Sequence, residues 1–246
     1  MLIFDDEFNK FRHCQDQYLY ERATKIKDYL REDGIIEIVA LLFEIIKGYK
    51  FLDLKQVKNS LKVIARLIDW NQLFLFTDIV NFTKENFLIS VPLLSENLEV
   101  FNSIIHKGMD YQQKIEVIKY LNINEILISI LRPSENIKIK IDETIFFKIC
   151  EIVTNLGDFV KDSYFSLKKS CTDKNLFTNE QNDLFQNTNS IANCTIFISN
   201  YILDLSKKFD HNTIFQISDF LNELITYLKS DEYVTNILVR KLRLIY

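Results

Sequence analysis

The chain has 246 residues, of which 48% are hydrophobic and 26% charged, and this composition excludes a wholly disordered protein. Its net charge of -4 disfavours nonspecific nucleic-acid binding over the whole surface but is compatible with a local basic groove. Glycine (4) and proline (2) are too scarce for the many tight turns of a β-sandwich or an α/β protein, so we expect long helices joined by short turns.

The cysteines and the N-terminus indicate in which cellular compartment the protein is expected to reside. The cysteines lie far apart without a CxxC pair, as is typical of reduced thiols in a nuclear or cytosolic protein; they are Cys14, Cys150, Cys171 and Cys194. The acidic N-terminal stretch does not resemble a signal peptide, and no apolar run reaches the ~20 residues that cross a membrane. We expect a soluble intracellular protein without membrane insertion.

Two amphipathic helices open the regular part of the chain. The first is predicted over 35–46, and Gly48 follows where a left-handed residue commonly ends a helix. The second is predicted over 53–69 with Asp53 as its N-cap. Its apolar face is formed by Val57, Leu61, Ile64, Ala65 and Ile68.

Further helices are predicted by the same three- and four-residue spacing of apolar side chains. They cover 72–90 (either continuous or broken near 78–81), 95–105 with Gly108 as its stop, 111–131, 142–159, 190–207, 212–229 and 231–244. The stretch 172–188 is polar and rich in Asn, so we expect a flexible loop there.

These helix pairs recur about every 40 to 47 residues, which is the spacing of HEAT or armadillo repeats. The predicted class is therefore all-α, a right-handed superhelical solenoid of HEAT-like helix pairs over residues 20–246, preceded by a lead-in over 1–19. An irregular helical bundle is the alternative. The solenoid is favoured because each pair is too apolar to be stable alone and would hide that surface against its neighbours.

Four short segments go beyond this pattern. The residues that follow the helix over 95–105 resemble the N-K-G-M-D-P-x-x-K line of the exportin-t receptors; they are His106, Lys107, Gly108, Met109, Asp110 and Lys114. The preceding run 100–105 resembles that family's L-F-E-I-V, the run 61–64 with Trp70 resembles its L-E-V-V…W, and Ile26-Lys27-Asp28 with Arg31 resembles its I-K-D-x-M-R. The chain departs from the family at His106, Tyr111 and Asn71-Gln72.

The resemblance implies a segment of a nuclear export receptor of the importin-β superfamily. Such a receptor carries tRNA together with Ran-GTP, meets nuclear pore proteins, and shuttles between nucleus and cytoplasm. In that family the Ran-binding repeats begin before the matched region, so the main Ran contacts are expected outside this chain.

A one-sided basic stripe marks the helix over 53–69. Its members follow at three- and four-residue steps and are Lys55, Lys58, Lys62 and Arg66. The second helix of a solenoid pair usually lines the concave surface, so the stripe is a candidate RNA-backbone contact, to which we add Lys107 and Lys114. The alternative is a solvated lysine face. Trp70, Gly108 and Met109 are interpreted as structural.

No catalytic motif occurs. The sequence lacks HExxH, GxSxG, Walker A and GxGxxG lines, and the three histidines, His13, His106 and His211, lie far apart. We therefore expect no enzyme activity, no metal and no cofactor. The competing function is a protein-only HEAT-repeat scaffold, importin-like or another adaptor, and a third is a relic of a larger receptor that binds nothing by itself.

Overall fold

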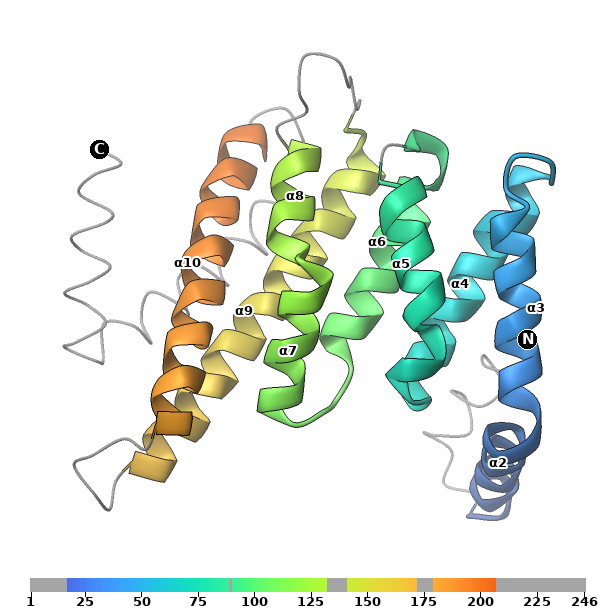
Figure 1. Ribbon diagram of the computed structural model, residues 1–246, viewed down its shortest axis with the longest axis horizontal. Helices are drawn as coiled ribbons and strands as arrows, with labels where there is room; N and C mark the ends of the chain where they lie inside the picture. Colours follow the sequence, from blue (N-terminus) through green and yellow to red (C-terminus); the bar gives the residue numbers. More distant parts are fainter. Residues whose placement is uncertain (1–16, 89, 132–140, 172–178, 207–246) are drawn as a thin grey trace. The chain divides into compact units, whose positions relative to one another are not determined.

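The computed structural model describes residues 17–88, 90–131, 141–171 and 179–206 (Figure 1). All regular secondary structure within these ranges is helical. The predicted all-α class is therefore confirmed for this part of the chain, whereas the superhelical solenoid stays a prediction. The chain divides into two compact units, Met1–Gly108 and Met109–Tyr246.

Within its described residues, the first unit is built of two helix pairs preceded by one further helix. In chain order its elements are α2 (Gln17–Tyr29), a π-helical turn (Leu30–Gly34), α3 (Ile35–Lys47), α4 (Leu54–Trp70), a 3₁₀ turn (Leu73–Phe76), α5 (Thr77–Asn86) and α6 (Val91–His106). Helix α3 packs on α4 and α5 on α6, while α4 lies along α6 and α3 contacts α5. The unit thus has two layers, α3 with α5 and α4 with α6, as expected of stacked helical repeats.

Helix α4 is the central element of this unit. Asp53 caps its N-terminus, where the carboxylate Oδ1 accepts from the Lys55 backbone N–H at 3.1 Å, as predicted. Such a cap stabilises a helix by ~1 kcal/mol. The predicted apolar face is confirmed, because Val57, Leu61, Ile64 and Ile68 are completely buried. Burial of each contributes roughly 1.5–3 kcal/mol, so this face fixes how α4 is rotated.

Gly48 ends α3 for a different reason from the one predicted. Its φ of -76° is not left-handed. A Cβ at this position would lie 3.0 Å from Leu52 Cδ1, so the glycine permits the close approach of Leu52. At this position the absence of a Cβ matters for the packing of Leu52 rather than for a special backbone conformation.

The helix predicted over 72–90 is broken, but earlier than at 78–81. A 3₁₀ turn covers Leu73–Phe76, and α5 then runs from Thr77 to Asn86. Helix α6 begins at Val91, four residues before the predicted start at residue 95. Proline lacks a backbone N–H and is accommodated in the first turn of a helix, which explains why Pro92 lies inside α6.

The second unit contains α7 (Tyr111–Leu121), α8 (Ile123–Leu131), α9 (Glu143–Cys171) and α10 (Asn179–Ser206). Helix α10 lies along α9 and also contacts α7 and α8. The single helix predicted over 111–131 is wrong. Asn122 interrupts it with φ 53° and ψ 41°, a left-handed conformation that Asn tolerates better than most residues.

The loop predicted over 172–188 is wrong for residues 179–188, which form the first turns of α10. Thr188 is buried there, and its hydroxyl donates to the Leu184 carbonyl at 2.8 Å. Tertiary packing thus overrides the low helix propensity of this Asn-rich stretch. Helix α9 likewise continues beyond the predicted end at residue 159 to Cys171, and α2 includes residues 17–19 of the predicted lead-in. Residues 172–178 and the helices predicted over 212–229 and 231–244 lie outside the described residues.

Two further features bear on the expected class of protein. None of the helices in the described ranges combines the length and the apolar character needed to cross a bilayer.

Cys150 is buried in α9, and burial raises the pKa of its thiol to about 12. At neutral pH it is therefore a protonated core side chain, as expected of a structural cysteine.

The left-handed residue between α7 and α8 generates a stability prediction. We expect Asn122→Ala to lower the free energy of unfolding by about 1 kcal/mol, because a Cβ without a local hydrogen-bonding group disfavours this conformation. Asn122→Gly should be neutral or stabilising, since glycine adopts it without strain. Thermal unfolding followed by circular dichroism measures both. A more stable Asn122→Ala variant would indicate that 111–131 prefers one continuous helix.

Candidate nucleic-acid interface

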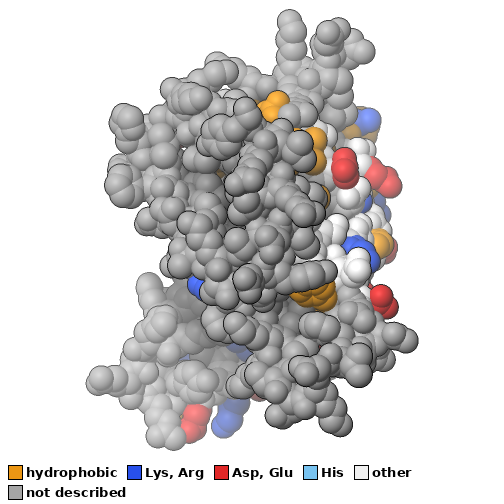
Figure 2. Space-filling view, turned by 90° about the vertical axis from the view of Figure 1, so that its left-hand side faces the viewer, with side chains coloured by type: hydrophobic (Ala, Val, Ile, Leu, Met, Phe, Trp, Pro, Cys, Tyr) orange, Lys and Arg blue, Asp and Glu red, His pale blue; other side chains and the backbone are white. Residues whose placement is uncertain are grey.

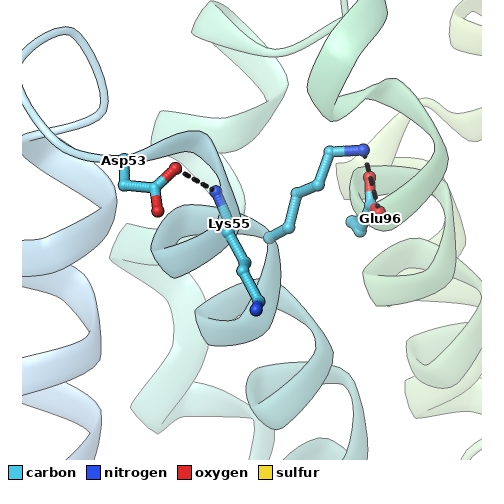
Figure 3. Close-up of polar contacts among 4 residues, drawn as sticks. Asp53, Lys55 and Glu96 are labelled. Atoms are coloured by element: carbon cyan, nitrogen blue, oxygen red, sulfur yellow. Dashed lines mark hydrogen bonds and ion pairs between the residues drawn. The ribbon is translucent and has the colours of Figure 1, made fainter.

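The basic stripe lies on α4 opposite its buried face, but its four members differ in environment. Lys55 and Lys62 are exposed, and neither has an ion-pair partner within the described part of the chain. Figure 3 shows the Lys55 side chain extending away from Asp53, whose carboxylate binds only the Lys55 backbone N–H. These two ammonium groups are the members of the stripe that are accessible to an anionic partner.

Lys58 forms an ion pair with a residue of the same unit. Its Nζ lies 3.3 Å from Glu96 Oε1 on α6, and the side chains are 34% and 9% exposed respectively (Figure 3). The second oxygen, Glu96 Oε2, is buried without a hydrogen-bond partner in the described structure. Lys58 is thus the counter-charge of a buried carboxylate. Moving it to a phosphate would leave that carboxylate unpaired, which is strongly unfavourable.

Helical geometry explains why Lys58 and not Lys62 takes this role. At about 100° per residue, Lys58 is the stripe member nearest to the buried Ala65 and therefore lies at the border of the packed face. Arg66 is half-buried and also interacts within the fold. The stripe predicted as four equivalent cations therefore consists of two exposed and two engaged ones.

Lys107 caps the C-terminus of α4. Its Nζ donates to the carbonyl oxygens of Ile68 at 2.7 Å and Asp69 at 3.1 Å. The last carbonyls of a helix have no intrahelical donor and carry partial negative charge, so an ammonium group stabilises them. This contact explains the position of Lys107 without any RNA, and the lysine joins the end of α6 to the end of α4.

Lys114 belongs to the second unit and is half-buried. Its Nζ lies 5.5 Å from the centroid of the Phe159 ring on α9, within the range of a cation–π contact. Burial lowers the pKa of Lys114 below its ordinary value, and the nearby Asp162 partly offsets this effect. The structure therefore places Lys114 in a packing role on α7.

Two residues from the segments that carry the sequence resemblance contact the end of α4. Lys27 of the Ile26-Lys27-Asp28 segment lies with its Nζ 5.5 Å from the centroid of the Trp70 ring. Lys107 binds the two carbonyls that immediately precede Trp70. Gly108 is exposed with open space around it, and Met109 is half-buried. Lys27 and Lys107 thus hold α2 and the end of α6 to α4, which is a structural role.

The sequence reasoning overlooked two features of this surface. One is Glu96, which neutralises Lys58 from a neighbouring helix; no sequence signal pairs these residues. The other is the turn between α3 and α4, where Phe51 is 92% exposed. The signal for it was present, because Lys50 and Phe51 follow the helix-ending Gly48.

Other parts of the described structure offer less to an anionic ligand. A groove of about 380 Å³ between α7 and α10 includes the carboxylates of Glu116 and Asp183 in its lining. Its lysine, Lys119, already donates to Asn187 Oδ1 at 2.8 Å. The described side chains visible in Figure 2 are acidic, basic and apolar in close alternation. No group of three or more potential metal ligands occurs among the described residues.

The chain is similar to proteins named exportin-T. It is 25% identical to the human protein over 158 residues, which are 63% of this chain and 16% of that protein. It is 26% identical to the Candida albicans protein over 116 residues, which are 46% of this chain and 11% of that protein. For the Lodderomyces elongisporus protein the identity is 28% over 113 residues. Neither a family model nor a solved structure matches the chain.

These comparisons support a distant exportin-like relationship. The matched regions span only 11% to 16% of the length of the Candida albicans and human relatives. The relatives are transport receptors by name rather than enzymes.

The role of Lys107 generates a prediction. We expect Lys107→Ala to lower the free energy of unfolding by about 1 kcal/mol, because two carbonyls at the end of α4 lose their donor. The matched control is Lys62→Ala, which removes an exposed lysine of the same unit and should change stability little. Chemical denaturation of both variants measures the difference. Equal stability of the two variants would contradict a capping role for Lys107.

The Lys58–Glu96 pair generates a second prediction. Lys58→Glu would place two carboxylates together at a largely buried position, so we expect a loss of about 2 kcal/mol in the free energy of unfolding. Lys62→Glu should leave the unfolding midpoint nearly unchanged. Glu96→Gln combined with Lys58→Glu should recover part of the loss, because the repulsion disappears. If Lys58→Glu is as stable as Lys62→Glu, the ion pair does not contribute to the fold.

Proposed function

We propose that the chain is a segment of a nuclear export receptor that binds tRNA through the exposed lysines of α4. The supporting observation is that Lys55 and Lys62 protrude from one face of a helix whose opposite face is fixed in the core. The similarity to exportin-T proteins favours tRNA as the ligand. A folded RNA is recognised mainly by shape and by its phosphates, for which spaced lysines on a rigid helix are suited.

The structure changes which lysines are expected to contact the RNA. Lys55 and Lys62 are the principal candidates, and Arg66 is a secondary one because it is half-buried. Lys58 and Lys107 are proposed as supports of this surface, and Lys114 as a packing residue of the second unit, since each already has a partner. Charge reversal at Lys58 would therefore report on folding as well as on RNA binding.

The proposed role as an export receptor determines which other partners are expected. Ran-GTP is expected to bind together with tRNA, with its main contacts on repeats outside this chain, and nuclear pore proteins are expected during passage between nucleus and cytoplasm. Dissociation would follow GTP hydrolysis on Ran, which shifts the population of receptor conformations.

A protein-only scaffold is the second candidate, and one observation favours it. The net charge is -4, and of the six lysine and arginine residues predicted to contact RNA, only Lys55 and Lys62 are exposed. Two cations provide a small electrostatic attraction by themselves, so an RNA surface would have to include further groups.

Filter binding of labelled tRNA tests the proposal. We expect retention by the full chain in the presence of Ran-GTP, with an affinity that decreases steeply with salt. The double variant Lys55→Ala with Lys62→Ala should lower the slope of log affinity against log salt by about 2, because each of the two lysines is expected to neutralise one phosphate. The control is Lys25→Ala with Lys119→Ala, which removes the same charge away from the stripe.

The outcomes separate the candidates. An unchanged slope in the stripe variant together with a reduced slope in the control would move the RNA surface away from α4. Absence of tRNA retention, combined with capture of Ran-GTP or another protein, would favour the scaffold.

A further inference from the structure

The turn between α3 and α4 presents an aromatic ring to solvent. Phe51 is 92% exposed, the highest value for any large apolar side chain in the described ranges. Leaving a phenylalanine outside the core forgoes the stabilisation that its burial would provide. The Phe51 ring is therefore available for contact with a partner of the chain.

The backbone that carries Phe51 is held in one conformation. The Phe51 and Leu52 backbone N–H groups donate to the Gly48 carbonyl at 2.9 and 3.2 Å. Leu52 lies against Gly48, since a Cβ at position 48 would be 3.0 Å from Leu52 Cδ1. The ring is thus displayed from a closed turn rather than from a flexible loop, which reduces the entropy lost when a partner binds.

A cluster of aromatic rings anchors this turn in the first unit. The Tyr49 ring meets Phe87 edge-on, with centroids 5.0 Å apart, and contacts Phe82 at 6.2 Å. Phe82 in turn packs edge-on against Phe87 at 5.9 Å. Three inward rings therefore hold the segment while the adjacent Phe51 points outward, so its exposure results from the architecture of the turn.

Two exposed lysines lie close to the exposed ring in the sequence. Lys50 precedes it and lies with its Nζ 5.6 Å from the Tyr49 ring centroid, while Lys55 follows four residues after Phe51 in the first turn of α4. Asp53, the acidic residue between them, is engaged in capping α4. The turn thus combines one accessible aromatic face with two lysines and leads directly into the exposed lysines of α4.

We propose that Phe51 stacks on an unpaired base of the RNA whose phosphates contact Lys50, Lys55 and Lys62. The inference rests on the proposed RNA-binding function and adds a contact to a single-stranded nucleotide beside the helical part of that RNA. Aromatic rings flanked by cations are the common device for holding unpaired nucleotides, and they act without base sequence preference.

The surroundings of Phe51 favour a base over an apolar partner. Leu52 and Leu54 are 41% and 44% exposed, so each is more than half covered, whereas the Phe51 ring is 92% exposed. A bilayer or an apolar helix needs several apolar side chains side by side. A single highly exposed ring that is preceded and followed in the sequence by exposed lysines suits a base and its phosphates.

Two RNA hairpins test the proposal, one blunt and one with the same stem and a few unpaired adenosines at its end. We expect the tail to increase the affinity of the full chain about tenfold, and Phe51→Ala to abolish this gain while leaving the blunt hairpin unaffected. Phe51→Tyr should retain the gain. The matched control is Phe74→Ala, which removes another exposed ring of the same unit, 69% exposed, and should also retain it.

Fluorescence of 2-aminopurine in the tail provides a direct signal, because stacking on Phe51 should quench it in the native chain and not in Phe51→Ala. A tail that gives no gain, or a Phe51→Ala variant that weakens both hairpins equally, would overturn the proposal. So would Phe51-dependent sedimentation with phosphatidylserine vesicles in the absence of a tail effect. The Lys55→Ala with Lys62→Ala variant separates the two claims: if it weakens the blunt hairpin while the tail adds nothing, only the stacking inference fails.

Discussion

The packing of α4 against α6 is the interaction on which the rest of the first unit depends. Four side chains of α4, Val57, Leu61, Ile64 and Ile68, are completely removed from solvent, and they fix the rotation of the helix about its axis. Once that rotation is fixed, the positions of its lysines follow from helical geometry. The exposed cations are therefore a consequence of core burial, and any RNA surface on α4 is presented by a rigid support.

Charged side chains neutralise both ends of α4 and a buried carboxylate at one border of the helix. Similar lysines therefore have different roles. Asp53 occupies the N-terminus, Lys107 occupies the C-terminal carbonyls, and Lys58 neutralises the buried Glu96. A lysine acts as support when a carbonyl or carboxylate of the fold lies within its reach. It remains accessible to ligand when it makes no such contact within the described residues, which is the case for Lys55 and Lys62.

The spacing of apolar residues and the capping residues in the sequence predicted the features that depend on neighbours in the chain. These are the all-helical class, the extent of α3 and α4, the Asp53 cap and the buried face of α4. This spacing did not predict the break at Asn122, because the apolar spacing continues through it and only the backbone conformation reveals it. The sequence pattern did not show that Lys58 is ion-paired and Lys62 exposed, since the partner of Lys58 lies on another helix. Lys27 and Lys107, which belong to the segments that resemble the exportin-t lines, contact the end of α4, so these two residues report on the fold more directly than on the ligand.

The most direct test of this account is the acetylation rate of individual lysines, measured by mass spectrometry with and without tRNA. In the free chain, Lys55 and Lys62 should react rapidly, and Lys58 and Lys107 slowly, because the latter are held by Glu96 and by the carbonyls of α4. Addition of tRNA should protect Lys55 and Lys62 and leave Lys25 unchanged. Equal reactivity of all five lysines in the free chain, or no protection of Lys55 and Lys62 by tRNA, would contradict it.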